Sequence, residues 1–205
     1  MVRTQRDNTI GVILAGGASR RMGRDKADVE IEGERMVDLV ADALGPVAGR
    51  LVVAGRTRPP SGVAAIAVPD AIDGQLGPLA GLAAVMSISP AGARLVTVAV
   101  DQPWVRTETL TALLDIDTEL PVVPVPDGIR QTTCAVFPAD LAVAAMEELK
   151  GGGSIQSLLD RSSFHPFTEE DMERTGEDGR SWFSVDTAEQ ISIGLAAFGR
   201  PGRIG

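Results

Sequence analysis

The chain has 205 residues, of which 44% are apolar, and its 28 acidic against 19 basic side chains give a formal net charge of −9. This charge argues against binding to nucleic acid or to an anionic membrane surface, and the single cysteine excludes an internal disulfide and a cysteine-cluster metal site. Without an apolar run of ~20 residues or a signal-peptide pattern, we expect a cytoplasmic protein with one domain over residues 1–205, flexible at 1–8 and at 200–205.

Short apolar runs alternate with segments of helical periodicity along the chain. In chain order, the pattern predicts strand 9–15, helix 36–47, strands 51–54 and 64–68, helix 78–87, strand 95–100, helix 107–114, strands 121–125 and 134–137, and helices 138–150, 154–160 and 187–198. Several strands are apolar on both faces, as buried parallel strands are. The β-α-β alternation predicts a doubly wound α/β domain with a mainly parallel sheet, whose ligands bind at the carboxyl ends of the strands.

The glycines at 151–153 allow two interpretations. They could form a linker, or they could separate two helices, with Ser154 capping the second one. Short connections between helices are common, which favours the second interpretation.

The stretch LAGGASRRMGRDK, residues 14–26, follows the first predicted strand. It is neither a Walker A loop nor a dinucleotide-binding G-x-G-x-x-G motif. Its glycine pair can bring backbone N–H groups close to an oxyanion, and Arg20, Arg21 and Lys26 can neutralise phosphate charge. The stretch therefore predicts a local phosphate site on an acidic protein, with a solvated surface turn as the alternative.

Two aspartates follow predicted strands. Asp101 closes the apolar run 95–100, and Asp70 comes after the strand at 64–68 and Pro69. Mg²⁺ prefers one or two carboxylates together with phosphate oxygens and water, so this edge of the sheet suits a Mg²⁺-nucleotide site. Each aspartate could instead be a turn residue beside a proline.

The residues 14–26 resemble the signature L-A-G-G-x-x-x-R-M-G-x-D-K of the molybdenum cofactor guanylyltransferases and match each specified position. The stretches PDAIDGQLGPLAGL at 69–82, VAVDQPWV at 98–105 and WFSVDTAEQI at 182–191 follow in the family's order. The resemblance implies a Rossmann-like nucleotidyltransferase fold and a Mg²⁺-dependent transfer of GMP from GTP to the phosphate of molybdopterin, with release of pyrophosphate. It also implies apoenzymes that accept the cofactor as partners.

The resemblance further implies roles for individual residues. The residues expected to contact the nucleotide are Leu14, Ala15, Gly16, Gly17, Lys26, Asp70 and Asp101. Lys26 and Arg21 are expected to neutralise the phosphates at the bond that breaks, and Asp101 is expected to hold Mg²⁺ and so to be catalytic. The residues expected to line the acceptor side of the cleft are Gly77, Pro78, Leu79 and Gly81.

The last motif departs from the family. Where the family tends to read N-x-N-T-P, this chain has residues 184–188 as SVDTA, so Asp186 stands at the second asparagine. A carboxylate is a stronger Mg²⁺ ligand than an amide, which makes Asp186 a candidate metal ligand. Alternatively, Asp186 or Thr187 caps the closing helix in a capping box with Gln190.

A second departure leaves the base open: residues 52–56 read VVAGR where an asparagine is common in the family. The alternatives are a cytidylyl- or other nucleotidyltransferase that acts on a related cofactor or a sugar phosphate, and a non-catalytic nucleotide-binding module that hands on cofactor.

Three further residues are weaker candidates. We expect Cys134 to be a buried strand residue and His165 to have a surface or capping role. Arg130 precedes a strand and could reach an acceptor phosphate, or it could be a solvated turn residue.

Overall fold

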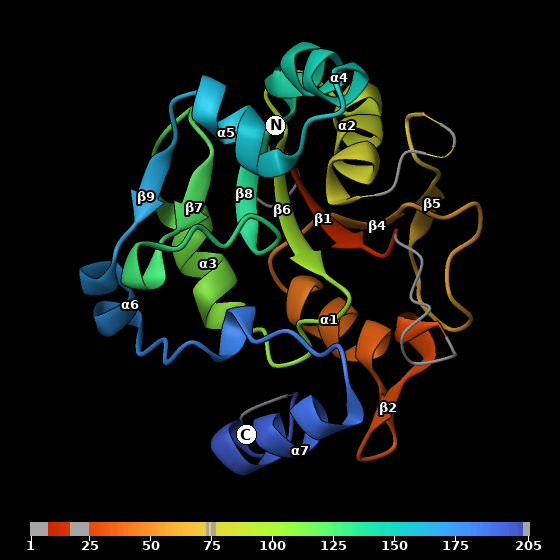
Figure 1. The fold of residues 1–205 in the computed structure, drawn as a ribbon, viewed down its shortest axis with the longest axis vertical. Helices are drawn as coiled ribbons and strands as arrows, with labels where there is room; N and C mark the ends of the chain where they lie inside the picture. The colour runs from red at the N-terminus through yellow and green to blue at the C-terminus, as the bar shows by residue number, and fades with distance from the viewer. Residues whose placement is uncertain (1–7, 17–24, 73, 75–76, 203–205) are drawn as a thin grey trace.

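The computed structural model describes residues 8–16, 25–72, 74 and 77–202, and a seven-stranded sheet forms its centre (Figure 1). The strands are β1 (Thr9–Leu14), β4 (Arg50–Ala54), β5 (Ile66–Val68), β6 (Arg94–Ala99), β7 (Val122–Pro124), β8 (Ala135–Pro138) and β9 (His165–Phe167). They lie in the order β5-β4-β1-β6-β8-β7-β9, and every neighbouring pair is parallel except the two pairs that β8 makes. The predicted α/β fold with a mainly parallel sheet is confirmed.

Strand β1 is the centre of the parallel part of the sheet. All six of its residues are buried, because alternate side chains enter the cores on both faces. Val12 packs in one core and Ile13 in the other. Leu14 aligns with Ala54 of β4 and Ala99 of β6, so these three strands end at one edge.

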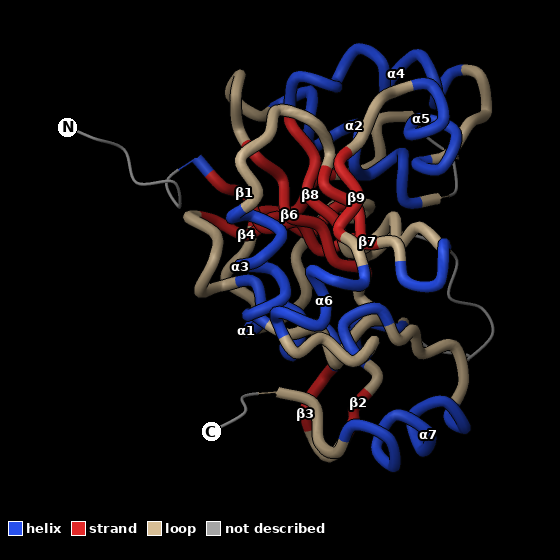
Figure 2. Tube along the Cα trace, turned by 90° about the vertical axis from the view of Figure 1, so that its left-hand side faces the viewer, coloured by secondary structure: helices blue, strands red, loops and turns tan. Residues whose placement is uncertain are grey.

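Helices cover both faces of the sheet (Figure 2). Their bounds are α1 (Met36–Leu44), α2 (Pro78–Ile88), α3 (Thr107–Asp115), α4 (Ala142–Lys150), α5 (Ile155–Arg161), α6 (Glu169–Thr175) and α7 (Ala188–Phe198). Residues of α2, α4 and α5 form one core with the sheet, and residues of α1, α3 and α6 form the other. No described helix has both the length and the apolar character needed to cross a membrane.

A third apolar cluster holds α7 beside a small hairpin, whose strands are β2 (Glu30–Ile31) and β3 (Glu34–Arg35) (Figure 2). Trp104 lies at its centre and is 3% exposed, with the rings of Phe183 and Phe198 at centroid distances of 5.7 and 6.2 Å. Gly194 of α7 lets the indole approach closely, since a Cβ there would lie 2.4 Å from Trp104 Cη2. The C-terminal helix is thereby fixed to the loop that follows Asp101.

The predicted secondary structure differs from the observed one mainly in a few short helices and strands. The hairpin strands, β9 and α6 were not predicted, and the predicted helix 138–150 begins as a separate 3-10 turn, Ala139–Leu141. His165 lies exposed on the edge strand β9, where a neighbouring proline is tolerated, and its surface position agrees with the predicted surface or capping role. Ser154 caps α5 in a capping box with Ser157, which confirms that residues 151–153 separate two helices.

Candidate functional site

The candidate site lies where β1, β4, β5 and β6 end. The backbone N–H of Ala15 donates to Ala54 O at 3.0 Å, and that of Val100 donates to Leu14 O at 3.0 Å. These bonds continue the parallel ladder for one residue beyond the strands. The segments that follow, with Gly16 and Asp101, therefore leave the sheet at the same edge, which is where ligands of open α/β sheets bind.

Gly16, Gly55 and Asp70 approach one another closely. Gly55 has φ +83°, and a Cβ on it would lie 2.4 Å from Gly16 Cα, so only glycine fits there. A Cβ on Gly16 would lie 3.4 Å from Asp70 Oδ1. The Asp70 carboxylate thus faces the backbone of the first loop.

Among the described residues, Asp70 Oδ1 is buried without a hydrogen-bond partner. Burial raises the pKa of the Asp70 carboxyl above its usual value. A carboxylate that is desolvated in this way costs stability, and such groups concentrate at functional sites.

Lys26 is the first residue of the short 3-10 helix η2 (Lys26–Asp28), which is fixed by a cap at its start and by a buried residue within it. The Asp25 carboxylate caps it by accepting from Ala27 N at 3.0 Å, and it also forms an ion pair with Arg56. Ala27 is fully buried. These contacts fix the backbone from which the Lys26 side chain projects.

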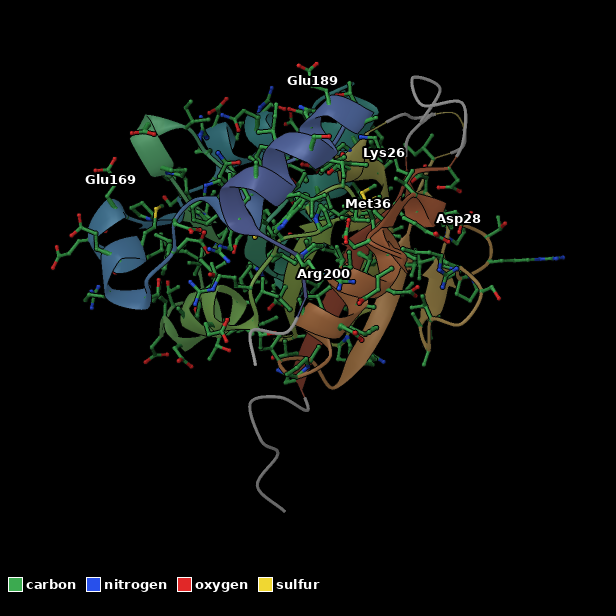
Figure 3. The ribbon with its side chains drawn as sticks, turned by 90° about the horizontal axis from the view of Figure 1, so that it is seen from below. Lys26, Asp28, Met36, Glu169, Glu189 and Arg200 are labelled. Atoms are coloured by element: carbon green, nitrogen blue, oxygen red, sulfur yellow. The ribbon has the colours of Figure 1, made fainter. Side chains whose placement is uncertain are left out.

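The Lys26 ammonium lies between two carboxylates, close to the beginning of α7 (Figure 3). Its Nζ donates to Asp101 Oδ2 at 2.7 Å and to Asp186 Oδ1 at 2.6 Å. Burial has the largest effect and lowers the pKa of Lys26, but the hydrogen bonds and charges of Asp101 and Asp186 together raise that pKa above its ordinary value. Lys26 is therefore a cation at neutral pH.

A turn after β6 positions Asp101. The next residue, Gln102, is 2% exposed, and its Oε1 accepts from Ala99 N at 3.0 Å and from Thr133 Oγ1 at 3.3 Å. Asp101 O accepts from the backbone N–H of Val185 at 2.8 Å. The aspartate predicted from its place after an apolar strand thus joins two distant segments.

Asp186 reaches the site from the far end of the chain. Thr187, not Asp186, is the N-cap of α7, and it forms the capping box with Gln190. Gln190 Oε1 also accepts from Asp186 N at 2.6 Å. The capping interpretation therefore holds for Thr187. The Asp186 carboxylate contacts Lys26 and is still a candidate metal ligand.

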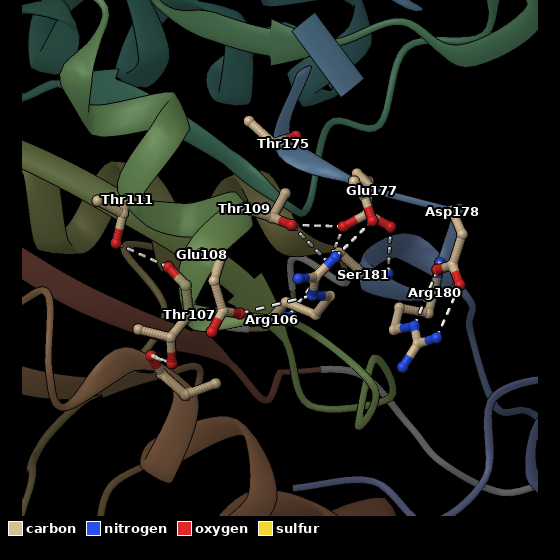
Figure 4. A network of polar contacts seen from close by, with 12 residues as sticks. Arg106, Thr107, Glu108, Thr109, Thr111, Thr175, Glu177, Asp178, Arg180 and Ser181 are labelled. Carbon is tan, nitrogen blue, oxygen red and sulfur yellow. Dashed lines mark hydrogen bonds and ion pairs between the residues drawn. The ribbon is translucent and has the colours of Figure 1, made fainter. Parts of the chain in front are cut away.

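A buried polar network anchors the segment that leads to Asp186 (Figure 4). The Glu177 carboxylate, 9% exposed, accepts from Ser181 Oγ at 2.5 Å, from Gly179 N at 2.8 Å and from the Thr109 hydroxyl of α3. Ser181 Oγ in turn accepts from Arg106 N at 3.1 Å. Sequence reasoning missed Glu177, because it is one acidic residue in an acidic stretch with no motif around it.

The remaining nucleotide and acceptor candidates have different surroundings. Leu14 is 5% exposed and Leu79 is 2% exposed, so both side chains belong to the core on the α2 face. Gly81 lets α2 approach β4, because a Cβ there would lie 3.0 Å from Ala54 Cβ. Gly77 is the N-cap of α2 and Pro78 its first residue, where the helix 78–87 was predicted to begin. Gly17, Arg20 and Arg21 lie outside the described residues.

Arg130 and Cys134 both have structural surroundings that account for them. Arg130 donates to Asp160 Oδ1 at 2.5 Å, and its guanidinium lies 5.5 Å from the centroid of the Phe164 ring. These contacts tie the turn before β8 to α5 and the residues after it. Cys134 is fully buried, as predicted, but it lies one residue before β8 and not in a strand, and burial raises the pKa of its thiol.

Residues 11–166 match the MobA-like NTP transferase domain. The chain belongs to this family. A probable molybdenum cofactor guanylyltransferase of Mycobacterium tuberculosis is 35% identical over 164 residues, which are 74% of this chain and 79% of the relative. A molybdenum cofactor guanylyltransferase of Rhizobium meliloti is 28% identical over 191 residues, 90% of this chain and 73% of the relative.

The fold is also that of a solved structure, molybdopterin-guanine dinucleotide biosynthesis protein A from Archaeoglobus fulgidus, with a TM-score of 0.74, 20% identity, and coverage of 91% of this chain and 96% of that one. The chain is accordingly a nucleotidyltransferase, as the resemblance implied. Asp186 lies beyond the residues that match the family model, and the structure brings it into contact with Lys26.

Nucleotidyltransferases of this family generally use a divalent metal. Within the described ranges, no cluster of three or more His, Cys, Asp or Glu side chains could hold one. Two carboxylates that converge on one point, as those of Asp101 and Asp186 do, nevertheless fit an ion that takes its other ligands from phosphate and water.

Proposed function

We propose that this protein transfers GMP from GTP to the phosphate of a molybdopterin-type cofactor and releases pyrophosphate, with Mg²⁺ as its divalent metal. The observation that carries the proposal is the meeting of Lys26, Asp101 and Asp186 at the ligand-binding edge of a MobA-like sheet. The choice of GTP and molybdopterin rests on relatives that are named molybdenum cofactor guanylyltransferases.

In the proposed reaction, an oxygen of the acceptor phosphate attacks the α-phosphorus of GTP in line. The new P–O bond forms as the bond from the α-phosphorus to the bridging oxygen of the β-phosphate breaks, and the electron pair leaves with pyrophosphate. Both reactants are anions, so the protein must position them and neutralise their charge. The reaction needs no covalent intermediate with the protein.

Asp101 and Asp186 would hold the Mg²⁺, which when bound supplies positive charge to the triphosphate and the leaving pyrophosphate. Lys26 donates to phosphate oxygens at the bond that breaks, as a compact charge on a flexible stem. We assign Arg21 the same task.

We assign Gly16 and Gly17 the task of contacting the nucleotide through backbone N–H groups, which glycines can bring close to an oxyanion. Leu14 and Ala15 hold that loop on the sheet through their backbone bonds, and Asp70 accepts from a donor of the nucleotide. The role of Asp70 agrees with its carboxylate oxygen Oδ1, which is buried and has no hydrogen-bond donor among the described residues. On the acceptor side, we propose contacts with the start of α2 at Gly77 and Pro78, while Leu79 and Gly81 serve to pack that helix.

Product analysis tests the proposal. The purified protein is incubated with Mg²⁺, molybdopterin and GTP, CTP or ATP, and the products are identified by mass. We expect the dinucleotide form of the cofactor and an equal amount of pyrophosphate from GTP. A dinucleotide formed from CTP alone would correct the base, and tight GTP binding with no dinucleotide from any triphosphate would favour the non-catalytic module.

A further inference from the structure

The space between Asp101 and Asp186 already has an occupant in the protein itself. Lys26 Nζ lies 2.7 Å from one carboxylate and 2.6 Å from the other, which are short, charge-assisted hydrogen bonds. The Lys26 side chain is only 14% exposed, and the Asp101 side chain is 22% exposed. The ammonium is thus held tightly and largely shielded from solvent.

A divalent cation bound by both carboxylates would need the same place. Mg²⁺ coordinates oxygen at ~2.0–2.1 Å and accepts little distortion, so it competes with Lys26 for the two carboxylates that now accept from the ammonium. An ammonium in contact with both oxygens would also repel the cation. The two carboxylates therefore hold a divalent cation poorly as long as the Lys26 ammonium stays in contact with both of them.

We propose that Lys26 is the internal counter-ion of the Asp101–Asp186 pair and is exchanged for the divalent cation when the triphosphate binds. When the triphosphate binds, its phosphate oxygens become the anionic partners of Lys26, and the two carboxylates bind the cation. Cation and nucleotide consequently bind in a coupled manner, and the cation alone binds weakly. This inference rests on the proposed function in one respect, the assignment of Asp101 and Asp186 as cation ligands.

The surroundings of Lys26 permit this exchange. Its backbone is fixed in η2 by the Asp25 cap and the buried Ala27, whereas its charge sits at the end of a flexible four-carbon stem. The Asp186 side chain is 43% exposed, so the pair is open to solvent on that side. A side-chain rotation can move the ammonium without unfolding the turn.

The chain offers a matched pair of variants for the test, because Lys26 and Lys150 are its two lysines. Lys26→Met removes the charge between the carboxylates and keeps an unbranched side chain. Lys150→Met removes the same charge at the end of α4, and thus controls for the change in net charge. Binding of Mn²⁺ alone, without nucleotide, is followed by the electron paramagnetic resonance signal of the free ion.

We expect Lys26→Met to bind one Mn²⁺ about tenfold or more tightly than the wild type, because two carboxylates lose a competing charge at contact distance. Lys150→Met should bind as the wild type does. Binding by Lys26→Met that is equal to or weaker than that of the wild type would overturn the exchange, as would the absence of Mn²⁺ binding to Lys26→Met. These outcomes do not depend on turnover, so they are distinguishable from a failure to transfer GMP.

A second measurement uses the wild-type chain and does not need the Lys26→Met variant to fold. With ¹³C at the lysine ε-carbon, the protein gives two side-chain signals, which Lys150→Met assigns. Titration with Mg²⁺ and a non-hydrolysable GTP analogue should shift the Lys26 signal saturably and leave the Lys150 signal in place. A Lys26 signal that is unchanged at saturation would mean that the ammonium stays on its carboxylates, against the exchange.

Discussion

The backbone N–H of Val185 donates to the backbone oxygen of Asp101 at 2.8 Å, and this bond brings Asp186 beside the end of β6. Val185 is fully buried in the cluster around Trp104. The C-terminal segment is therefore part of the site's construction, and Asp186 meets Lys26 across 160 positions of sequence.

Asp186→Asn tests the part that this segment plays in holding the metal. It keeps the shape and the helix cap at Thr187 but replaces a charged oxygen with a neutral one, so the Mg²⁺ concentration for half-maximal rate should rise roughly tenfold or more. Glu189→Gln, an exposed change in the first turn of the same helix, is the control. An unchanged Mg²⁺ dependence in Asp186→Asn would leave the cation to Asp101 and phosphate alone.

Gly55→Ala tests the close approach between β4 and the first loop. The new Cβ would lie 2.4 Å from Gly16 Cα at a φ of +83°, so we expect a loss of about 2 kcal/mol or more in the free energy of unfolding. Gly92→Ala is matched, because Gly92 has φ +72° and no atom within 4 Å of the added Cβ. It should lose only about 1 kcal/mol. Equal losses in denaturant melts would show that the contact with Gly16 contributes nothing.

Asp70→Asn should stabilise the protein while weakening nucleotide binding. At neutral pH the native state carries a desolvated carboxylate whose pKa is raised, so removal of the charge should increase the free energy of unfolding. Because the native pKa lies above the unfolded one, the wild type recovers this stability as the pH falls through the native value toward 3.8. The difference between the two proteins should therefore shrink in acid.

Chemical denaturation between pH 7 and pH 4, with calorimetry of GTP binding at pH 7, checks the Asp70 prediction. Asp42→Asn, an exposed change on α1, should alter neither quantity. A variant that is less stable than the wild type at pH 7 would show that Asp70 is a structural carboxylate.

Glu177→Gln tests the buried network behind Asp186. Gln keeps one acceptor oxygen but presents an N–H₂ group to donors from Ser181, Gly179 or Thr109, so we expect a loss of about 1–3 kcal/mol in the free energy of unfolding. The Mg²⁺ requirement should rise as well, because the segment that delivers Asp186 loosens. Glu173→Gln, exposed on α6, is the control. Lower stability with an unchanged Mg²⁺ requirement would limit Glu177 to a structural role.

Much of the fold could be predicted from local patterns. The strand at β1 is apolar at nearly every position because both of its faces are buried, and Asp101 marks the site because it directly follows a buried strand. The hairpin strands are two residues each, too short to show a period. The helix α6 is almost wholly polar, with Met172 its one buried residue, so no apolar periodicity predicted it.

The contacts of the site were harder to predict than its members. The resemblance supplied Lys26, Asp101 and Asp186 separately, but their junction depends on the Val185–Asp101 bond and on the packing of α7 around Trp104. Such long-range contacts leave no periodic signal. Asp70 was predicted as a site residue, whereas its unpartnered oxygen follows from the approach of Gly16 and Gly55 in three dimensions.

The central claim is that Lys26 and its two carboxylates form the centre at which GMP is transferred, and single-turnover transfer of label from [α-³²P]GTP to molybdopterin tests it most directly. The wild type should place the label in the dinucleotide product, and Lys26→Ala should do so about 10²- to 10³-fold more slowly, the scale for the loss of one preorganised charge. Lys150→Ala should match the wild type. Transfer at the wild-type rate by Lys26→Ala, or label that appears only in GDP or free GMP, would contradict the account.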